Sequence, residues 1–415
     1  MKRVVVTGTG AITPIGKNVE DFIAGLKAGT SGAGGITLFD TDQFKTTFAC
    51  EVPDFKPEEH EVDKREARRM DRFAQFGIAS THEALVQAGL ADGDHGIDPL
   101  RIGVIYGSGI GGLGSLQKEI EDSAAPKPPR HNPFMIPKMI VDIAAGLISM
   151  RYNFMGPNFA TVSACATANH AVMCACDAIK LGRADIVVTG GAEAAITRTG
   201  VGGFSNMKAL SSRNDDPKTA SRPYDLDRDG FVLGEGAGTL VLEEYEHAKA
   251  RGANILCEVV ATSATADAHH ITAPHPEGEG ASRAMTIALK EAGLNVGDID
   301  YLNTHGTSTP LGDVAELKAI QKTFGDAAYA MNISSTKSMT GHLLGAAGAI
   351  ETIAGIAAIR DGFVPPTINH FTDDPAIDAK LNLTFNEAQQ RKVDAVLSNG
   401  FGFGGHNAVV ILKRV

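Results

Sequence analysis

The sequence predicts an α/β protein in which layers of helices surround β-sheets. Short apolar runs alternate with segments of helical periodicity along the whole chain. Several of these runs are apolar on both faces, as strands covered by helices on both sides are. The chain has 415 residues, 43% of them hydrophobic, which is enough for the large core of two domains or of one duplicated domain.

The expected elements follow in order along the chain. Each strand candidate is a short apolar run bounded by turn-forming or charged residues, and the candidates are residues 3–8, 101–108, 185–193, 238–245, 257–266, 301–305, 393–401 and 407–415. Each helix candidate is a longer segment with apolar residues at helical spacing, and the candidates are residues 71–89, 136–151, 166–181, 280–292, 313–324 and 345–360.

Two of the strand-like segments resemble each other. VVVTGTGAIT near residue 4 and EVVATSATADA near residue 258 are both apolar runs that lead into small and hydroxyl residues. Alone, this similarity leaves open whether the chain consists of two related halves; if it does, the halves are residues 1–255 and 256–415.

The composition excludes several classes of partner. A net charge of -11 and the absence of Trp argue against nucleic acid, whose binding needs a broad basic face. No apolar run approaches the ~18 residues of a membrane span, and MKRVVVTGTG lacks the apolar region of a signal peptide. The five cysteines are sparse, odd in number and without framework spacing. We therefore expect a cytoplasmic protein with no membrane partner.

Three motifs resemble ligand sites but lack the residues that would complete them. GSGIGG (107–112) fits a dinucleotide fingerprint, yet no second strand with its acidic residue follows, so we interpret it as a closely packed glycine turn. DLDRDGFVLGEG (225–236) begins like a calcium loop, but Gly236 stands where the bidentate carboxylate is required. The histidines of DAHHITAPHPEG have no thiol or carboxylate set to complete a metal site. We expect no metal.

Cys165 is the candidate nucleophile in TVSACATANHAVMCACDAIKLG (161–182). A strand-like FATV precedes it, and a helix that Gly182 can cap follows it. This is the placement of a nucleophile elbow, where free N–H groups and the helix dipole favour a thiolate and receive an oxyanion. Cys174 and Cys176 lie deeper in the helix, and we interpret them as packing. On local grounds alone, Cys165 is equally consistent with packing.

Groups in the C-terminal half favour acyl chemistry on the thiol. NTHGTSTPLGD places His305 where a strand ends and a polar turn begins. STKSMTGHLLGAAGAIE places Lys337 and His342 in a small-residue turn and Glu351 on the following helix. SNGFGFGGHNA (398–408) is a glycine-rich turn between two apolar strands. Loops that leave strands are the usual position of sites on α/β sheets.

These motifs resemble the elongating β-ketoacyl-acyl carrier protein synthases of type II fatty-acid synthesis. The resemblance rests on SACATANH, HGTSTPLGD, KSMTGHLLGAAG, GFGFGGHNA and RPYDLDRDGFVLGEGAG, and it covers essentially the whole chain. It implies the thiolase-like fold, a five-layered αβαβα sandwich of two similar halves. It also implies a homodimer that works with acyl carrier protein.

The resemblance implies a decarboxylative Claisen condensation that lengthens an acyl chain on Cys165 by two carbons. His305 and His342, if neutral, each donate an N–H to the developing enolate, and burial near cationic Lys337 favours the neutral form. By resemblance, Lys337 organises the site and pairs with Glu351. No cofactor is expected, because decarboxylation itself supplies the carbanion.

Further implied residues line the paths of the substrates. The backbone N–H groups of Cys165 and Phe403 hold the acyl oxyanion. Phe401 or Phe403 gates the entrance, although core packing is equally consistent with either ring. Ile110 is a wall of the acyl pocket, and hydroxyl groups line the pantetheine tunnel, namely Thr307, Thr309 and Thr272.

Docking of an acidic carrier protein needs a local basic patch. DKREARRMDR provides one, with Lys64, Arg65, Arg68, Arg69 and Arg72. Two departures from the family pattern are Gly400, where many members carry Ser, and His406, where many carry Thr. We assign no role to His406.

Three other functions compete with this interpretation. A ketosynthase of a polyketide or other specialised pathway shares the fold and the residues, and only its products separate it. A non-catalytic subunit that shapes chain length is expected to lack the nucleophile, which this chain keeps. A nicotinamide oxidoreductase that uses GSGIGG predicts nucleotide binding.

Overall fold

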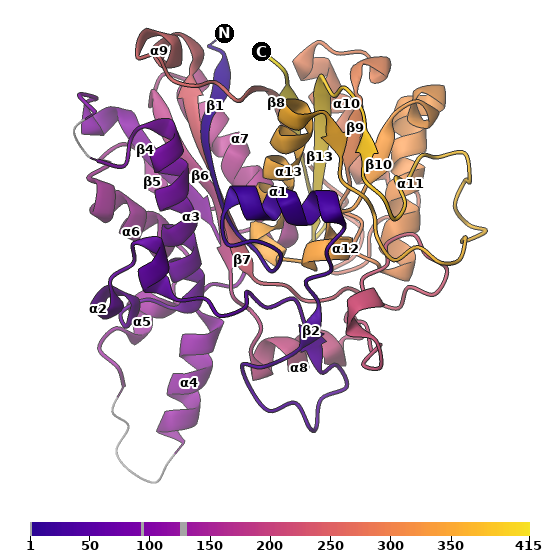
Figure 1. The fold of residues 1–415 in the computed structure, drawn as a ribbon, viewed down its shortest axis with the longest axis horizontal. Helices are drawn as coiled ribbons and strands as arrows, with labels where there is room; N and C mark the ends of the chain where they lie inside the picture. Colours follow the sequence, from indigo (N-terminus) through magenta and orange to yellow (C-terminus); the bar gives the residue numbers. More distant parts are fainter. Residues whose placement is uncertain (1, 93–94, 125–130) are drawn as a thin grey trace.

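The computed structural model describes residues 2–92, 95–124 and 131–415 (Figure 1). Its main sheet has ten strands in the order β5-β4-β6-β7-β1-β8-β14-β13-β9-β10. The first half contributes β1 (Val4–Ile12), β4 (Ile102–Gly107), β5 (Asn158–Phe159), β6 (Ile186–Glu193) and β7 (Gly236–Glu244). The second half contributes β8 (Cys257–Ala266), β9 (Tyr301–Asn303), β10 (Asn332–Ser334), β13 (Ala395–Gly402) and β14 (His406–Lys413).

The two halves of the sheet repeat one topology. From the centre outward, each half runs first, fifth, fourth, second and third strand of its own sequence. The pairings are antiparallel, antiparallel, parallel and parallel in both. The halves join where β1 pairs with β8 through only two residue pairs, Val5 with Glu258 and Val6 with Cys257.

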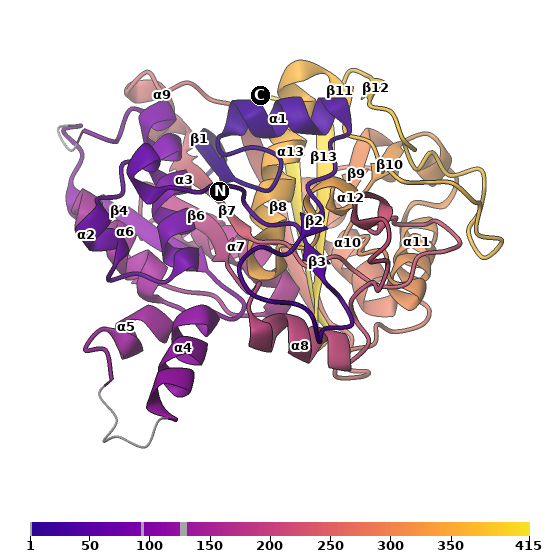
Figure 2. The ribbon, with the colours of Figure 1, turned by 60° about the horizontal axis from the view of Figure 1, so that its bottom comes forward.

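Helices form three layers around these strands (Figures 1 and 2). In the middle, α7 (Thr167–Lys180) and α13 (Ala347–Asp361) share one core cluster with strands of both halves. The outer helices α3 (Arg72–Ala88) and α6 (Ile143–Tyr152) cover the first half. The outer helices α10 (Glu279–Ala292) and α11 (Pro310–Phe324) cover the second. The expected five-layered, thiolase-like sandwich is confirmed.

Shorter elements complete the fold. The remaining helices are α1 (Val19–Ala28), α2 (Lys64–Ala67), α4 (Leu113–Ser123), α5 (Met135–Met139), α8 (Arg198–Asn206), α9 (Tyr245–Ala250) and α12 (Lys337–Thr340). Two small two-stranded sheets pair β2 (Gly34–Gly35) with β3 (Phe48–Ala49) and β11 (Phe363–Val364) with β12 (Gln389–Gln390). Within the described residues, no helix is both long and apolar enough to cross a membrane.

All eight expected strands are present, but one expected helix is wrong. Residues 136–151 form two helices, α5 and α6, because Ile140 takes an extended conformation between them. The N–H of Gly112, in a neighbouring loop, donates to the carbonyl oxygen of Met139 at 3.1 Å. The C-terminal end of α5 is thus bonded to this loop. The sequence also missed the three-residue strand β10.

Candidate active site

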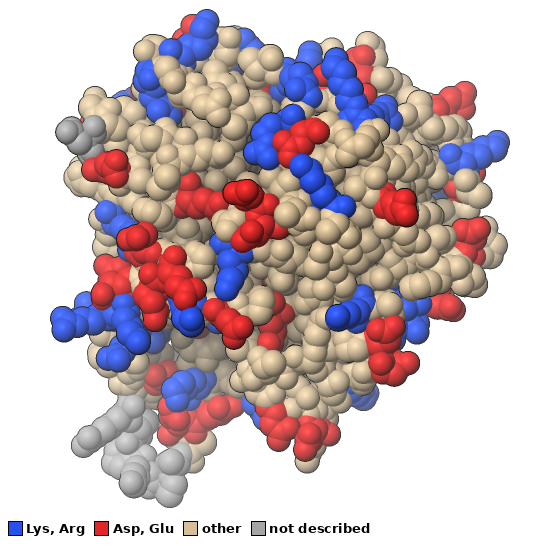
Figure 3. Space-filling view, viewed as in Figure 1, with Lys and Arg blue, Asp and Glu red and all other residues tan. Residues whose placement is uncertain are grey.

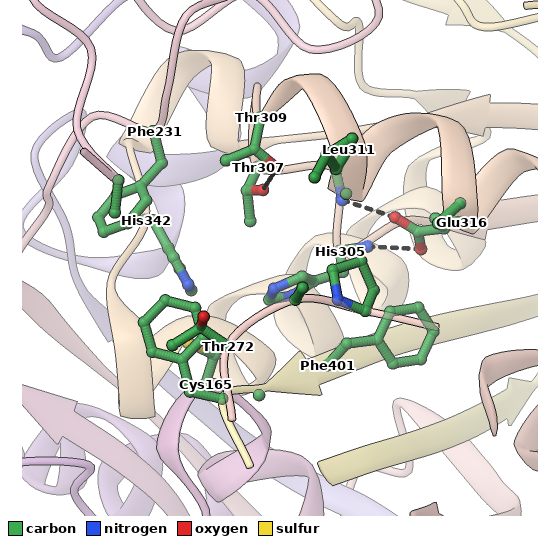
Figure 4. A pocket seen from close by; sticks show the side chains of 18 of the residues that line it. Cys165, Phe231, Thr272, His305, Thr307, Thr309, Leu311, Glu316, His342 and Phe401 are labelled. Carbon is green, nitrogen blue, oxygen red and sulfur yellow. Dashed lines mark hydrogen bonds between the residues drawn. The ribbon is translucent and has the colours of Figure 1, made fainter. Parts of the chain in front are cut away.

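Cys165 lies in a tight turn that leads into α7. The turn, Ala164–Ala166, is a 3-10 helix, and we call it the first elbow. Ala164 has a left-handed backbone with φ of 49°, the strained conformation of an elbow in front of its functional residue. The Cys165 side chain is only 7% exposed and lines a cavity of about 400 Å³ (Figure 4).

The Cys165 thiol is protonated in the free protein. Burial raises its pKa to about 12, although the charge of Lys337 and the backbone N–H of Phe403 act in the opposite direction. The expectation of a thiolate at this helix start is therefore wrong, because desolvation of the sulfur outweighs the favourable partners. The nucleophile must lose its proton as it attacks.

His305 and His342 face Cys165 across the cavity (Figure 4). His305 follows β9, and His342 lies between α12 and the 3-10 turn Leu344–Ala346, which we call the second elbow. The two ring centroids are 5.2 Å apart, with the rings nearly perpendicular. The ring nitrogens and the Cys165 sulfur lie within 4.8 Å of one another. The structure thus brings together three residues that are far apart in the sequence.

The tautomer of His342 follows from its neighbour. The backbone N–H of Leu344 donates to Nδ1 at 3.3 Å, so the ring proton must be on Nε2. Nε2 is buried and has no hydrogen-bond partner among the described residues. A buried donor without a partner is costly, so this N–H is suited to a substrate oxygen in the cavity.

Both imidazoles are neutral. Burial lowers the pKa of His305 and of His342 well below the ordinary value, and the charge of Lys337 lowers both further. This is the direction expected from the sequence.

The set of Cys165, His305 and His342 has the residue types of a zinc site, but the hydrogen bond to His342 Nδ1 favours a donor role for this ring. A thiol and two imidazoles are ligands that zinc accepts. The Nε2 of His342, however, carries a proton and has no lone pair for a metal, while its Nδ1 already accepts from Leu344. Oxygen atoms that suit a hard cation lie elsewhere: Asn303 Oδ1, Ser398 Oγ and Glu351 Oε2 are buried and unpaired within the described residues.

Lys337 forms a buried ion pair with Glu351. Both side chains are almost fully enclosed, and Nζ of Lys337 donates to Oε1 of Glu351. Burial raises the pKa of Glu351, and the charge of Lys337 opposes that shift. The pairing of Lys337 with Glu351 that the resemblance implied is therefore present.

The GFGFGG turn approaches the first elbow closely. A Cβ added to Gly402 would lie 2.7 Å from the carbonyl oxygen of Ser163 and 3.1 Å from the nitrogen of Cys165. Only glycine therefore allows β13 to end there. The backbone N–H of Phe403 lowers the pKa of the Cys165 thiol, while the N–H of Cys165 finds no acceptor among the described residues. These two groups are the expected oxyanion donors.

Most of the expected substrate-binding residues line the same cavity, namely Thr272, Thr307, Thr309, Phe401 and Phe403. The hydroxyls of Thr307 and Thr309 are 3.0 Å apart, and the Phe401 ring lies 5.7 Å from that of His305. Ile110 does not line this cavity; it packs in the apolar cluster that contains Cys165 and Leu344. Its role as a wall of an acyl pocket stays a prediction. His406 is exposed and also lies outside the cavity lining.

Glu316 is a site residue that the sequence analysis missed. Its carboxylate lines the cavity and accepts the backbone N–H groups of His305 and Gly306, each at 2.8 Å (Figure 4). Burial raises its pKa to about 7. The available signal was its position on the helix that HGTSTPLGD begins, where a carboxylate in the second turn can reach back to the preceding loop. Glu316 thereby fixes the backbone from which His305 projects.

The basic residues expected to dock a carrier protein do not all lie at one surface cleft. Arg65, Arg68 and Arg69 line a surface cleft, whereas Lys64 lies 3.9 Å from Glu58 beside another one. Figure 3 shows basic and acidic side chains intermingled over this face. Arg72 is excluded from docking, because its guanidinium binds both oxygens of buried Glu235, at 2.9 and 2.6 Å.

Comparisons with known proteins agree with this geometry. Residues 1–248 match the family model "Beta-ketoacyl synthase, N-terminal domain", and residues 256–371 match "Beta-ketoacyl synthase, C-terminal domain". The chain is 49% identical to 3-oxoacyl-[acyl-carrier-protein] synthase 2 of Staphylococcus aureus (strain N315), covering 100% of this chain and 98% of that one.

Two solved structures are similar over the full length. A beta-ketoacyl synthase from Burkholderia phymatum STM815 has a TM-score of 0.93 and 37% identity, with 100% of both chains covered. A type II polyketide ketosynthase in complex with its acyl-carrier protein, AntDE:AntF, has a TM-score of 0.91 and 31% identity, covering 100% of this chain and 99% of the other.

Proposed function

The chain belongs to the β-ketoacyl synthase family and is a condensing acyltransferase of the 3-oxoacyl-[acyl-carrier-protein] synthase type, and we propose that Cys165 carries the acyl chain it extends. One observation supports this assignment most: the buried Cys165 sulfur lies within 4.8 Å of two imidazoles. Both are neutral, and one presents an unpartnered Nε2–H.

The first step is a thioester exchange. The Cys165 sulfur attacks the carbonyl carbon of the acyl carrier thioester, and the negative charge develops on the carbonyl oxygen. The N–H groups of Cys165 and Phe403 are placed to stabilise it. When the intermediate collapses, the bond to the carrier's sulfur breaks, and that sulfur leaves with the proton of the Cys165 thiol.

The second step forms the new carbon–carbon bond. The malonyl carrier thioester loses CO2, and the electron pair of the broken bond forms an enolate whose oxygen accepts N–H donors from His305 and His342. The enolate carbon attacks the Cys165 thioester, and the Cys165 thiolate leaves and is reprotonated. Neutral imidazoles suit this role, because they donate without having to lose a charge. No cofactor takes part in this scheme.

Glu351 and the cavity hydroxyls complete the proposed machinery. Glu351 compensates the charge of Lys337, and burial together with that charge keeps both imidazoles neutral. Thr272, Thr307 and Thr309 offer hydroxyls to the amides of a pantetheine arm, and Phe401 lies beside His305 where an entering thioester must pass.

Acyl carrier protein is the proposed partner. A similar ketosynthase has been solved with its own acyl-carrier protein, and Arg65, Arg68 and Arg69 provide an exposed basic cleft for an acidic partner, while Lys64 lines a separate cleft. Replacing the three arginines by Glu should raise KM for the carrier without changing kcat. Lys290→Glu, an exposed position on α10, is the control for the loss of a positive charge.

A homodimer is proposed from the outer edge of the first half. There β5 is an unpaired edge strand, and Phe159 and Val162 are 44% and 59% exposed. At the other edge, β10 is fully buried. An apolar edge strand of this kind is suited to pairing with a second copy. Light scattering should give a dimer for the wild type and a monomer for Phe159→Asp.

The reaction products distinguish the proposed substrate from the competing one. We propose saturated fatty acyl chains because the similar full-length relative is a 3-oxoacyl-[acyl-carrier-protein] synthase 2. The similarity to a polyketide ketosynthase supports the alternative of a specialised acyl chain. Incubation with malonyl carrier and saturated acyl carriers of several lengths tests this, and a lack of any elongated product would overturn the fatty-acid assignment.

Two further assignments rest on this function. The five cysteines are free thiols, which supports the reducing cytoplasm as the location of the enzyme. The repeated strand order and the two family matches support a boundary between the halves at residues 255 and 256.

A further inference from the structure

Glu193 at the end of β6 is a fully buried carboxylate that the mechanism above does not use. Its Oε1 accepts from the Ser108 hydroxyl at 2.8 Å and the Ile110 N–H at 3.1 Å. Its Oε2 accepts from the Gly109 N–H at 2.8 Å and the Gly345 N–H at 3.0 Å. Every contact is a donor, and these hydrogen bonds favour the ionised carboxylate, whereas burial raises the pKa of Glu193.

These donors come from two loops that flank the active site. Ser108, Gly109 and Ile110 belong to GSGIGG, so the glycine N–H groups that bind pyrophosphate in nucleotide enzymes here bind an internal carboxylate. The other donor, Gly345, is in the second elbow. A Cβ added to Gly345 would lie 2.3 Å from the Gly109 nitrogen, so the two loops touch directly at this carboxylate.

The second elbow also fixes the catalytic His342. The N–H of Leu344 donates to His342 Nδ1, and the next N–H in the chain, that of Gly345, donates to Glu193. Leu344 has a left-handed backbone with φ of 47°, a strained conformation that persists only where the surroundings hold it. A shift of Glu193 would therefore release the turn that sets the His342 tautomer.

We propose that Glu193 is a positioning residue whose carboxylate occupies the anion-binding turn of the second elbow and fixes the His342 turn against the loop that carries Ile110. This inference rests on the proposed function. Because Ile110 packs in the cluster that contains Cys165, Glu193 links the surroundings of the acyl thioester to the geometry of the enolate donors.

The test compares Glu193→Gln with Glu83→Gln. Glu83 is a comparable carboxylate, since it too accepts backbone N–H groups, two where Glu193 accepts three, those of Val19 and Ala11, but it lies away from the cavity. The first measurement is malonyl-carrier decarboxylation, which Glu193→Gln should reduce about 10- to 100-fold through misplacement of His342. The second measurement is the pH profile of Cys165 alkylation by iodoacetamide, followed by mass spectrometry. In Glu193→Gln this profile should shift toward lower pH, because a negative charge near the thiol is lost.

A purely structural role of Glu193 predicts a different outcome. Glu193→Gln would then resemble Glu83→Gln, with reduced thermal stability but unchanged decarboxylation per folded molecule and an unchanged alkylation profile, and the inference would be overturned. Glu193→Asp, which keeps the charge, should retain the wild-type alkylation profile.

If Glu193→Gln does not fold, Gly345→Ala takes its place. The added methyl group pushes the Glu193 carboxylate away but leaves its charge in place. The variant should therefore decarboxylate malonyl carrier more slowly, while the pH profile of Cys165 alkylation stays the same. Unchanged decarboxylation would contradict the inference. A wild type that neither decarboxylates malonyl carrier nor alkylates at Cys165 would instead overturn the proposed function.

Discussion

The first and second elbows occupy equivalent places in the two halves. Each precedes the helix between the third and fourth strands of its half. Ala164 and Leu344 have φ of 49° and 47°, and the residues that begin the next helices, Thr167 and Ala347, have φ and ψ that agree within one degree. By this equivalence, Cys165 corresponds to Gly345.

The elbows differ in what reaches them from the opposite half. Gly402 ends β13 and brings no side chain to the first elbow, so the Cys165 N–H stays available to an oxyanion. Glu193 ends the equivalent strand, β6, and its carboxylate takes the N–H of the second elbow. The duplicated backbone thus offers two anion-binding turns, one open to substrate and one closed by the protein's own anion. The half with the closed turn supplies the histidines instead.

The largest expected effect comes from removing the nucleophile that distinguishes the first elbow. Cys165→Ala should reduce condensation by at least about 10⁴-fold, because no other thiol stands at this turn. Elongation of acyl carriers is the measurement, and an unchanged melting temperature is the control for folding. Persistent elongation would mean that the elbows do not differ in the way proposed.

Removal of an enolate donor should have the next largest effect. His342→Ala should reduce malonyl-carrier decarboxylation about 10²- to 10³-fold, the usual cost of losing one oxyanion donor. Transfer of an acyl group to Cys165, measured by mass spectrometry, should be affected far less, because its oxyanion uses backbone donors. Equal loss of both steps would contradict the division of labour between the halves.

A methyl group at Gly402 tests whether the first elbow must stay open. Gly402→Ala places a Cβ 3.1 Å from the Cys165 nitrogen, and we expect acyl transfer to fall about 10- to 100-fold. Gly203→Ala is the matched control, since an added Cβ there meets nothing within 4 Å. Similar acylation rates in the two variants would show that the close approach of β13 has no catalytic value.

The smallest expected effect is that of pH on the rate of decarboxylation, which should not change. Because the pKa values of His305 and His342 lie well below 6.5, decarboxylation between pH 8 and 6 should stay flat in a Glu316→Gln variant, which lacks the carboxyl group whose pKa is about 7. A decline with a midpoint near 6.5 would show that a donor imidazole titrates normally. The same residues make folding less favourable as the pH falls below 6.5, because the unfolded imidazoles bind protons first.

The sequence identified the site through residues of distinctive chemistry in turns after strands. Cys165, His305, Lys337 and His342 all met that criterion, and so did the glycine turn beside Cys165. Glu193 and Glu316 did not, since a carboxylate bound mainly by backbone N–H groups leaves no pattern of charged complementary side chains. The protonation state of Cys165 was mispredicted for a similar reason: its burial depends on residues from the opposite half.

The surface was the least predictable part. Arg72 belongs to the same basic run as Arg65 and Arg68, yet it turns inward to Glu235. A charge run in the sequence does not show which member has a buried partner more than a hundred residues away. The break between α5 and α6 was missed for the same reason, a partner distant in the sequence. The loop that bonds to the end of α5 contains residue 112.

The two-residue junction of β1 with β8 has a consequence for catalytic precision. The thiol belongs to one half and the imidazoles to the other, yet only two strand residue pairs align the halves. Their alignment therefore depends also on the packing of α7 and α13, both rich in alanine, against each other and against strands of the opposite half. Adding or removing single methyl groups in this dry interior should tune the distance between sulfur and imidazole, and hence the reaction rate, without altering any polar group of the site.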